Sequence, residues 1–330
     1  MPGTDVLVVS VGSTTGWGLA ANELVQSLSR AGAKVAMVDT GKLRRVRTFA
    51  LTDLVEARAA RHACIQGIAR HDPAAIIYCS MTAALLWPRP GAVWLDSIAA
   101  ENRPGRHGVW QRTVERRRLR ETPMVLAMSN RALDPLDASA VTDDVVLVPV
   151  PVERSGPPAP TRDVDVVAYA GNPEKKRLDY VLDAWSRARC GDETLVVAGT
   201  DRLAPAQGVK VAGRMAPADY RALLRRARVF VAAPRREDYG IAPLEALADG
   251  CMLVTTPAPG PYPALDIARQ LDCRLVGEDL VSALRTALDD PAPMYADRAA
   301  ELVAPFSRQA VDETVAQEVL PRLLTTLRSR

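Results

Sequence analysis

A buried-strand pattern followed by a glycine-containing turn and a helix occurs twice in this chain, near its start and again past its middle. Residues 6–11 are an uninterrupted apolar run before a loop with three glycines. Residues 164–170 are a second run, with one aspartate, before Gly171. Apolar runs bounded by glycine are typical of parallel strands buried on both faces. The pattern therefore predicts two α/β domains, each beginning with a strand, a turn and a helix.

The alternation of strand-like and helix-like segments continues through both halves of the chain. Strands are predicted at 34–38, 75–79, 92–95, 124–128 and 145–148, and then at 164–170, 194–198, 209–211, 229–232 and 252–256. Residues 151–163 contain four prolines and no apolar periodicity, which is typical of a linker. We therefore expect an N-terminal domain over 1–152, a linker over 153–163 and a C-terminal domain over 164–307. An amphipathic helix is expected over about 308–327.

Composition limits the classes of protein to which the chain can belong. It has 330 residues, 48% hydrophobic and 25% charged, values typical of a globular protein with about two domains. Five scattered cysteines without a C-x-x-C pair, and only three histidines, argue against a disulfide frame or a metal centre. No apolar run approaches the ~18 residues of a membrane span, and the first residues lack a secretory signal. These features favour a cytoplasmic protein.

The stretch from Arg235 to Thr256 carries the most chemical information. It contains two glutamates, Glu237 and Glu245, eight positions apart, with Gly240 and the start of a helix between them. Gly240 would let the backbone approach a ligand, and the next two amides, of Ile241 and Ala242, would form a phosphate cradle. Carboxylates on both sides of such a cradle suit a nucleotide sugar. The alternative is a helix N-terminus at which the dipole favours two acids.

This stretch resembles the E-x7-E signature of family-4 retaining glycosyltransferases of the GT-B fold. The matching positions are Glu237, Tyr239, Gly240, Glu245, Ala246 and Gly250, whereas Ala242 stands where the family usually has proline. Segments 171–185, 196–201, 211–215 and 128–131 resemble other blocks of the family in the same order. The resemblance implies two Rossmann-like, doubly wound domains that face each other across a cleft.

The resemblance also implies roles for individual residues in transfer from a nucleoside-diphosphate sugar. Lys176 would bind the donor diphosphate, Glu237 the sugar hydroxyls and Glu245 the ribose. Backbone around Tyr239 would offer amides at Gly240, Ile241 and Ala242, and the backbone near Arg214 and Met215 would meet the base. No metal or cofactor other than the donor is expected, because cations and oriented N–H groups stabilise a departing diphosphate.

The chain departs from the family at several positions. Asn172, after Gly171, replaces the family arginine, and Lys175 or Arg177 would have to substitute for it. Asp96 follows the strand that ends V-W-L, where the family often has a histidine, and is therefore a candidate catalytic residue. These departures keep two alternatives open: a sugar-nucleotide epimerase of the same fold, and a nucleotide-sugar-binding protein without activity.

The loop from Gly12 to Gly18 is a second candidate for ligand contact. Gly12 and Gly16 would permit close approach, and Ser13, Thr14 and Thr15 could donate hydrogen bonds. The full G-x-G-x-x-G spacing of a dinucleotide site is absent, and the alternative is a tight strand–helix turn.

The positive charge of the chain is concentrated in one segment. Residues 1–150 carry 18 basic and 14 acidic side chains, too small a surplus for a dedicated nucleic-acid binder. The surplus is greatest over 102–120, where Arg112, Arg116 and Arg120 recur at helical spacing after a loop with Arg103 and Arg106. One interpretation is a solvated helix face. The other is a site for an anionic acceptor or a peripheral contact with an acidic membrane surface.

Asp163 and Asp165 form a D-x-D sequence, the metal motif of the other large glycosyltransferase fold. They stand at the end of the linker, before a strand, where chelation by both side chains is not favoured. No metal role is therefore assigned to them.

Overall fold

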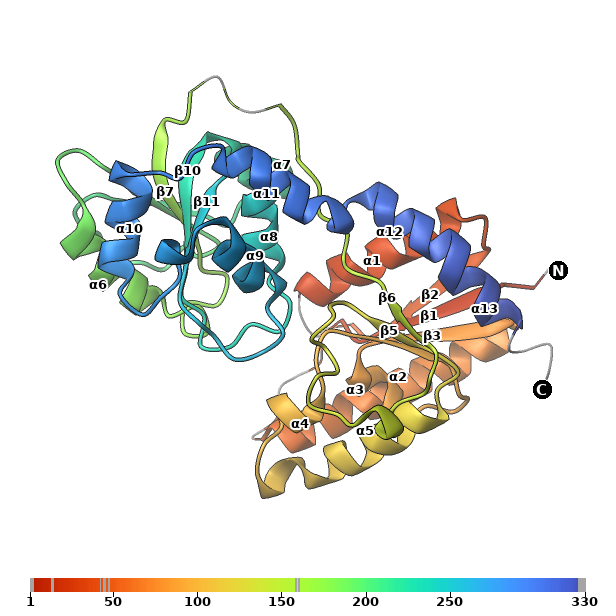
Figure 1. Cartoon of the computed structure of the whole chain (residues 1–330). Helices are drawn as coiled ribbons and strands as arrows, with labels where there is room; N and C mark the ends of the chain where they lie inside the picture. The colour runs from red at the N-terminus through yellow and green to blue at the C-terminus, as the bar shows by residue number, and fades with distance from the viewer. Residues whose placement is uncertain are drawn as a thin grey trace. The chain divides into compact units, whose positions relative to one another are not determined.

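The computed structural model describes residues 3–12, 15–41, 43, 46, 48–157, 159 and 161–325, and only the backbone of Thr15, Phe49, His107 and Ala138. Contacts divide the chain into two compact units, coloured by position along the sequence in Figure 1. Unit 1 comprises residues 1–151 together with 308–330, and unit 2 comprises residues 152–307. Each unit is built around one parallel sheet.

The sheet of unit 1 has six strands in the order β2-β1-β3-β4-β5-β6, all parallel. They are β1 (Val6–Ser10), β2 (Val35–Asp39), β3 (Ala75–Cys79), β4 (Ala92–Leu95), β5 (Val125–Ala127) and β6 (Val145–Leu147). All five residues of β1 are buried, whereas the edge strand β2 has no fully buried residue. Continuous apolar runs therefore lie at the centre of the sheet, as expected for parallel strands covered on both faces.

The connections in unit 1 are helices and short 3-10 turns. They are α1 (Thr15–Arg30), α2 (Phe49–His71), α3 (Met81–Ala84), α4 (Ala99–Asn102), η1 (Arg106–Gly108), α5 (Val109–Glu121) and η2 (Ala138–Ala140). The long helix α2 was not predicted, because its apolar and polar residues are weakly segregated. Its start is capped by Thr48, whose hydroxyl accepts a hydrogen bond from the Leu51 N–H at 3.3 Å.

The C-terminal segment packs on unit 1, beside α1 (Figure 1). It consists of α12 (Arg308–Thr314), a π-helical turn η5 (Val315–Val319) and α13 (Leu320–Thr325). One face is apolar and buried, through Val311, Val315, Val319 and Leu323. Ion pairs join it to the N-terminal part of the chain: Arg308–Glu23 and Arg30–Asp312, each at 2.6 Å. Residues far apart in sequence thus complete one core.

The sheet of unit 2 has five parallel strands in the order β11-β10-β7-β8-β9. They are β7 (Val164–Tyr169), β8 (Leu195–Ala198), β9 (Val209–Gly213), β10 (Ala227–Ala232) and β11 (Met252–Thr255). Every strand predicted from the sequence is present in the two sheets, with ends that differ by one or two residues. The α/β class and the two parallel sheets predicted from the sequence are confirmed.

The helices of unit 2 are α6 (Leu178–Ala188), α7 (Pro217–Arg226), α8 (Ile241–Ala248), α9 (Pro263–Leu271), α10 (Leu280–Asp289) and α11 (Tyr295–Val303), with 3-10 turns η3 (Cys273–Leu275) and η4 (Ala304–Phe306). The segment expected to be a linker lies within unit 2. There the Val152 N–H donates to the Phe306 carbonyl at 2.7 Å, and Ser155 binds the side chain of Asp249. Within the described residues, no helix is both long and apolar enough to span a membrane.

Candidate functional site

The loops at the carboxyl edge of the unit 2 sheet carry most of the predicted site residues. All five strands run parallel, so their carboxyl ends meet at one edge, where ligands bind in open α/β sheets. The loops after β7, β9 and β10 hold predicted residues at 171–177, 213–215 and 233–240. The loop after β11, residues 256–262, brings further residues that sequence reasoning did not select.

Lys176 and Glu237 form an ion pair at this edge. The Lys176 ammonium donates to a carboxylate oxygen of Glu237, and the two side chains are 26% and 14% exposed. The Glu237 N–H is held by the Pro259 carbonyl at 3.0 Å, and the Lys176 N–H by the Asn172 carbonyl at 3.0 Å. Two residues 61 positions apart in sequence are thus brought together, as a shared site requires.

The turn between Glu237 and α8 depends on glycine. Gly240 has φ +81°, a left-handed conformation, and a Cβ there would lie 3.0 Å from Glu237 Cγ and 3.1 Å from the Tyr262 ring. Tyr262 is fully buried, has φ +29°, and its hydroxyl lies 3.0 Å from Thr255 Oγ1. Its ring therefore lies against Gly240, on the side where a Cβ would project. Sequence reasoning missed Tyr262; its signal is the Gly260-Pro-Tyr-Pro context, which marks a constrained turn.

Glu245 lies in the second turn of α8 within a buried ionic cluster. Arg221 of α7 approaches it at 3.5 Å (Nη1 to Oε1) and pairs with Asp249 at 2.7 Å. Burial raises the pKa of Glu245 to about 7, against the opposing effect of Arg221, and Asp249 adds to the rise. Arg221 and Asp249 were not selected from the sequence, which has no local pattern that marks them.

The loop after β7 positions three residues around the missing family arginine. The Asn172 side chain accepts a hydrogen bond from the Lys175 N–H at 3.0 Å, so Asn172 shapes the turn that presents Lys176. The Arg177 guanidinium stacks on the Tyr180 ring at 4.2 Å and lies 3.9 Å from the Glu278 carboxylate. Lys175 is exposed. Gly171 is required by space, because a Cβ there would lie 2.7 Å from the Tyr169 hydroxyl.

The loop after β9 is held by Asp201. Its carboxylate accepts a hydrogen bond from the Arg214 N–H at 3.1 Å, and it lies 3.7 Å from the Arg214 guanidinium, which is 83% exposed. Gly213 has φ +69° and approaches the same carboxylate closely. Met215 is half-buried beside it. The backbone N–H of Arg214 is thus held, while the arginine side chain is exposed to solvent.

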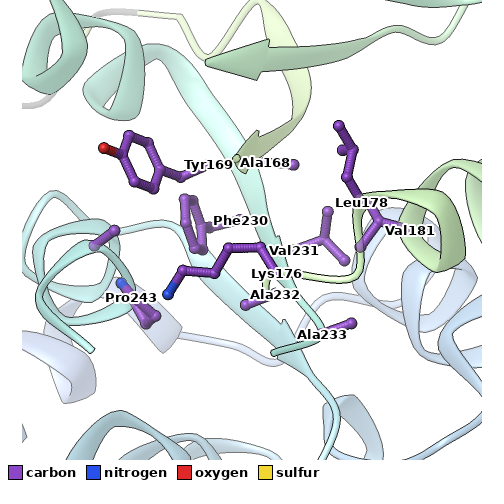
Figure 2. A pocket seen from close by; sticks show the side chains of 11 residues that line it. Ala168, Tyr169, Lys176, Leu178, Val181, Phe230, Val231, Ala232, Ala233 and Pro243 are labelled. Atoms are coloured by element: carbon purple, nitrogen blue, oxygen red, sulfur yellow. The ribbon is translucent and has the colours of Figure 1, made fainter. Parts of the chain in front are cut away.

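A pocket lies beside Lys176 and the start of α8 (Figure 2). Its lining is mostly apolar: Ala168, Tyr169, Leu178, Val181, Phe230, Val231, Ala232, Ala233, Ala242 and Pro243, together with Lys176. In Figure 2 the Lys176 side chain extends past Phe230 toward the start of α8, where Pro243 lies. The first amides of α8, at Ile241 and Ala242, have no partner one turn earlier in the helix. An ammonium and a helix N-terminus therefore converge, which favours an anionic ligand.

The three predicted residues in the other unit lie at the carboxyl edge of the unit 1 sheet. Gly12 approaches Asp39, at the end of β2, so closely that a Cβ would lie 2.5 Å from the carboxylate. Gly16 is in the first turn of α1, where a Cβ would meet nothing within 4 Å. Asp96 follows β4 and accepts a hydrogen bond from the Ser97 hydroxyl at 3.1 Å. Ser13 and Thr14 lie outside the described residues, as does the side chain of Thr15.

The arginines of 102–120 are partly engaged in the fold. Arg103 binds the buried Asp53 through two hydrogen bonds, of 2.6 and 2.9 Å, and Arg112 donates to the Arg103 carbonyl. Arg103 therefore joins the loop after α4 to α2, and Arg112 joins α5 to that loop. Arg116 and Arg120 are exposed.

The D-x-D aspartates have partners of their own. Asp163 pairs with Arg226, and Asp165 lies 3.6 Å from Arg228 and accepts the Thr194 N–H at 2.9 Å. In the part of the chain that the structure describes, no three His, Cys, Asp or Glu side chains gather in a way that could hold a metal ion.

The region that contains this site matches a known family. Residues 164–290 match the family described as Glycosyl transferases group 1. Unit 2 carries a glycosyl transferases group 1 domain. Lys176, Glu237, Gly240 and Glu245 all lie within the matched residues of this domain. A comparison with curated protein sequences gave no match.

Solved glycosyltransferase structures resemble the whole chain, including the part outside the group 1 domain. Sucrose-phosphate synthase (tll1590) from Thermosynechococcus elongatus has a TM-score of 0.76 at 16% identity, over 97% of this chain and 99% of that one. Alr3699/HepE from Anabaena, in complex with UDP and glucose, has a TM-score of 0.69 at 14% identity, over 96% of this chain and 99% of that one. WaaG, a glycosyltransferase involved in lipopolysaccharide biosynthesis, has a TM-score of 0.68 at 12% identity, over 94% of this chain and 98% of that one. The chain has the GT-B fold; at these identities the likeness does not reach the substrate.

Proposed function

We propose that this protein is a retaining glycosyltransferase that moves a sugar from a nucleoside-diphosphate sugar to a small or anionic acceptor. The observation that carries the proposal is the arrangement of Glu237 and Glu245 on either side of the Gly240 turn, with Lys176 forming an ion pair with Glu237. The group 1 domain, and the complex of Alr3699/HepE with UDP and glucose, support the class of donor. Retention of configuration is inferred from the E-x7-E resemblance.

The donor diphosphate is proposed to bind at Lys176 and at the first amides of α8. In the reaction, the bond between the anomeric carbon and the diphosphate oxygen breaks, and negative charge develops on the diphosphate. An ammonium and helix N–H groups stabilise that charge in the transition state. Because the protein supplies these positive groups, the proposal includes no metal. Lys175 extends the same cationic loop.

The two glutamates are proposed to bind the two sugars of the donor. Glu237 accepts hydrogen bonds from hydroxyls of the transferred sugar. Its ion pair with Lys176 places this sugar site beside the proposed diphosphate site. Glu245 accepts hydrogen bonds from the ribose hydroxyls in its ionised form. Burial raises its pKa to about 7, so the ionised form is available at and above neutral pH.

The acceptor is proposed to bind to unit 1, where Asp96, Gly12 and Gly16 lie at the carboxyl edge of its sheet. Exposed Arg106, Arg116 and Arg120 favour an anionic acceptor, through screened attraction that weakens at high salt.

The first test concerns Glu245. The nucleotide is chosen from UDP, GDP and ADP by the stabilisation that each gives to the wild type; a ligand at 100 times its Kd adds about 2.7 kcal/mol. Glu245→Ala should then weaken binding of that nucleoside diphosphate, since each charged hydrogen bond contributes about 1.5–3 kcal/mol. Calorimetry measures the change, with Glu174→Ala, an exposed residue of the loop after β7, as the control.

Glu237→Ala distinguishes the proposed role of Glu237 from that of Glu245. Its proposed partner is the transferred sugar, so turnover and affinity for the intact donor should fall. Affinity for the nucleoside diphosphate should hold or rise, because Lys176 loses its competing carboxylate.

Three results would overturn the proposal: no stabilisation by any of the three nucleotides or their sugars, equal loss of nucleotide affinity in both variants, or an isomerised free sugar as the product in place of a glycoside.

A further inference from the structure

Two nitrogens of the Arg221 guanidinium donate hydrogen bonds to other groups, and the third nitrogen lies near Glu245. Its Nε donates to Asp249 at 2.7 Å and its Nη2 to the Glu153 carbonyl at 2.6 Å. The remaining nitrogen, Nη1, lies 3.5 Å from Glu245 Oε1. The side chains of Arg221 and Glu245 are 14% and 23% exposed, and that of Asp249 is fully buried. The planar fork of arginine permits these three contacts at once.

Asp249 is itself fixed by groups outside α7. The Ser155 N–H and hydroxyl donate to its carboxylate at 2.8 and 2.9 Å, and the Arg162 guanidinium donates to its carbonyl at 2.9 Å. Gly250, next in sequence, has φ +82° and leaves space for Arg162, since a Cβ would lie 2.5 Å from that guanidinium. Asp249 thus accepts hydrogen bonds from the segment that enters unit 2 and from α7, and it anchors Arg221 rigidly.

Among the described residues, three charged or titratable groups act on Glu245: the Arg221 guanidinium and the Tyr220 hydroxyl from α7, and Asp249, which directly follows α8. Burial and Asp249 both disfavour the carboxylate and raise its pKa, whereas Arg221 lowers it. Among these groups, Arg221 is therefore the one that stabilises the ionised form of Glu245.

We propose that Arg221 is a positioning residue, which holds the Glu245 carboxylate in place and keeps it ionised so that it can accept the ribose hydroxyls of the donor. The inference rests on the proposed role of Glu245 in donor binding. It predicts that nucleotide affinity depends on pH through Glu245, and that this dependence changes when Arg221 is replaced.

The first measurement is a titration of Glu245 without any ligand. Protein labelled with ¹³C in its glutamate carboxyl groups is titrated by NMR, and the Glu245 signal is assigned by its loss in Glu245→Gln. We expect a midpoint near 7 in the wild type and a higher midpoint in Arg221→Gln. Arg225→Gln is the control, since Arg225 lies one turn along α7 and donates to Ser155 but does not contact Glu245.

The second measurement is the Kd of the stabilising nucleotide, among UDP, GDP and ADP, between pH 5.5 and 8.5. If the Glu245 midpoint moves from about 7 to about 8, the ionised fraction at pH 7.5 falls about threefold, and the Kd should rise correspondingly. Profiles are divided by that of Glu245→Gln, which removes the contribution of phosphate titration. Arg221→Lys keeps the charge but has a single nitrogen in place of the planar fork that spans three acceptors, so it should lie between wild type and Arg221→Gln. It replaces Arg221→Gln if that variant does not fold.

The outcomes separate this inference from the proposed function. A raised midpoint with weaker binding in Arg221→Gln, and neither in Arg225→Gln, supports the positioning role. If Glu245→Gln weakens binding but the Arg221 variants keep the wild-type midpoint and Kd, the positioning role is wrong and the ribose role stands. If Glu245→Gln binds the nucleotide as well as the wild type, the ribose role itself is wrong.

Discussion

At the scale of single residues, the turn that presents Glu237 depends on backbone conformations that residues with a side chain adopt only at a cost in free energy. Gly240 turns the chain from the Glu237 loop into α8, and its Cα hydrogen faces both the glutamate and the Tyr262 ring. Tyr262 itself has a positive φ, a conformation that costs about 1–3 kcal/mol and persists only where the surroundings enforce it. One strained backbone position, Tyr262, therefore lies beside the turn that presents the sugar-binding candidate, Glu237.

Gly240→Ala tests whether the turn before α8 requires glycine. Alanine at φ +81° costs about 1–2 kcal/mol, and its methyl group would crowd Glu237 and Tyr262, so we expect the free energy of unfolding to fall by about 1–3 kcal/mol. Gly277→Ala is the control in the same unit, because its φ is not positive and a Cβ there meets only the Asp279 nitrogen at 4.0 Å. Urea unfolding measures both. Equal stability of the two variants would contradict the role given to Gly240.

At the scale of secondary-structure elements, α5 carries a buried acid on an otherwise basic helix. Both Glu115 carboxylate oxygens accept the Ala99 N–H, at 2.9 and 2.7 Å, which joins α5 to the start of α4. Burial raises the pKa of Glu115 from 4.5 to about 7. The folded protein therefore binds this proton more tightly than the unfolded chain does, and the contribution of Glu115 to the free energy of unfolding decreases as pH rises from about 4.5 to about 7.

Glu115→Gln should remove this pH dependence. The amide oxygen can still accept the Ala99 N–H without an ionisation, so the variant should match the wild type near pH 4.5 and exceed it by up to about 3 kcal/mol at pH 8. Tryptophan fluorescence during urea unfolding reports mainly on unit 1, which holds Trp17, Trp87, Trp94 and Trp110. Glu121→Gln, at an exposed ion pair with Arg117, is the control and should change stability by less than about 1 kcal/mol. If the difference in free energy of unfolding between Glu115→Gln and the wild type does not grow over this pH range, the assignment is refuted.

At the scale of the whole molecule, unit 1 is assembled from both ends of the chain. Four buried residues of α12–α13, and the ion pairs to Glu23 and Arg30, complete a core that begins with β1 and α1. Each buried Val or Leu contributes about 1.5–3 kcal/mol. The C-terminal segment is therefore a structural part of unit 1.

A chain that ends at Ser307 should lose stability in one unit only. Hydrogen exchange is expected to quicken in β1 and α1 but to stay unchanged in β7 and β10. Leu323→Ala, with an expected loss of about 2–5 kcal/mol, gives the same contrast in a full-length chain. Arg322→Ala is the control, since its ion pairs are exposed. Equal exchange in unit 1 of the truncated and complete chains would exclude this role for the segment.

Much of the fold could be predicted from the sequence, because apolar runs such as 6–11 and 75–79 are buried on both faces and leave a continuous signal. Helix α2 was missed, since its polar and apolar residues are not clearly separated by face. In the site, Glu237 and Gly240 were selected through the local E-x7-E motif, and Lys176 through a separate segment that resembles the same family; the structure brings them together. Arg221, Asp249 and Tyr262 act through contacts with residues distant in sequence, which spacing alone does not reveal. For the same reason, the binding of Arg103 to Asp53 was not foreseen.

The hydrogen bond between the Val152 N–H and the Phe306 carbonyl, at 2.7 Å, has a consequence for how such a chain can be rearranged. It joins the first residue of unit 2 to the penultimate one, so the unit starts and finishes at neighbouring points. Topologically, unit 2 is an insertion into unit 1, with adjacent ends of the kind that tolerate domain insertion and circular permutation. A segment of residues 152–307 could therefore be exchanged as a cassette between related chains, and the proposed donor site would move with it as one piece.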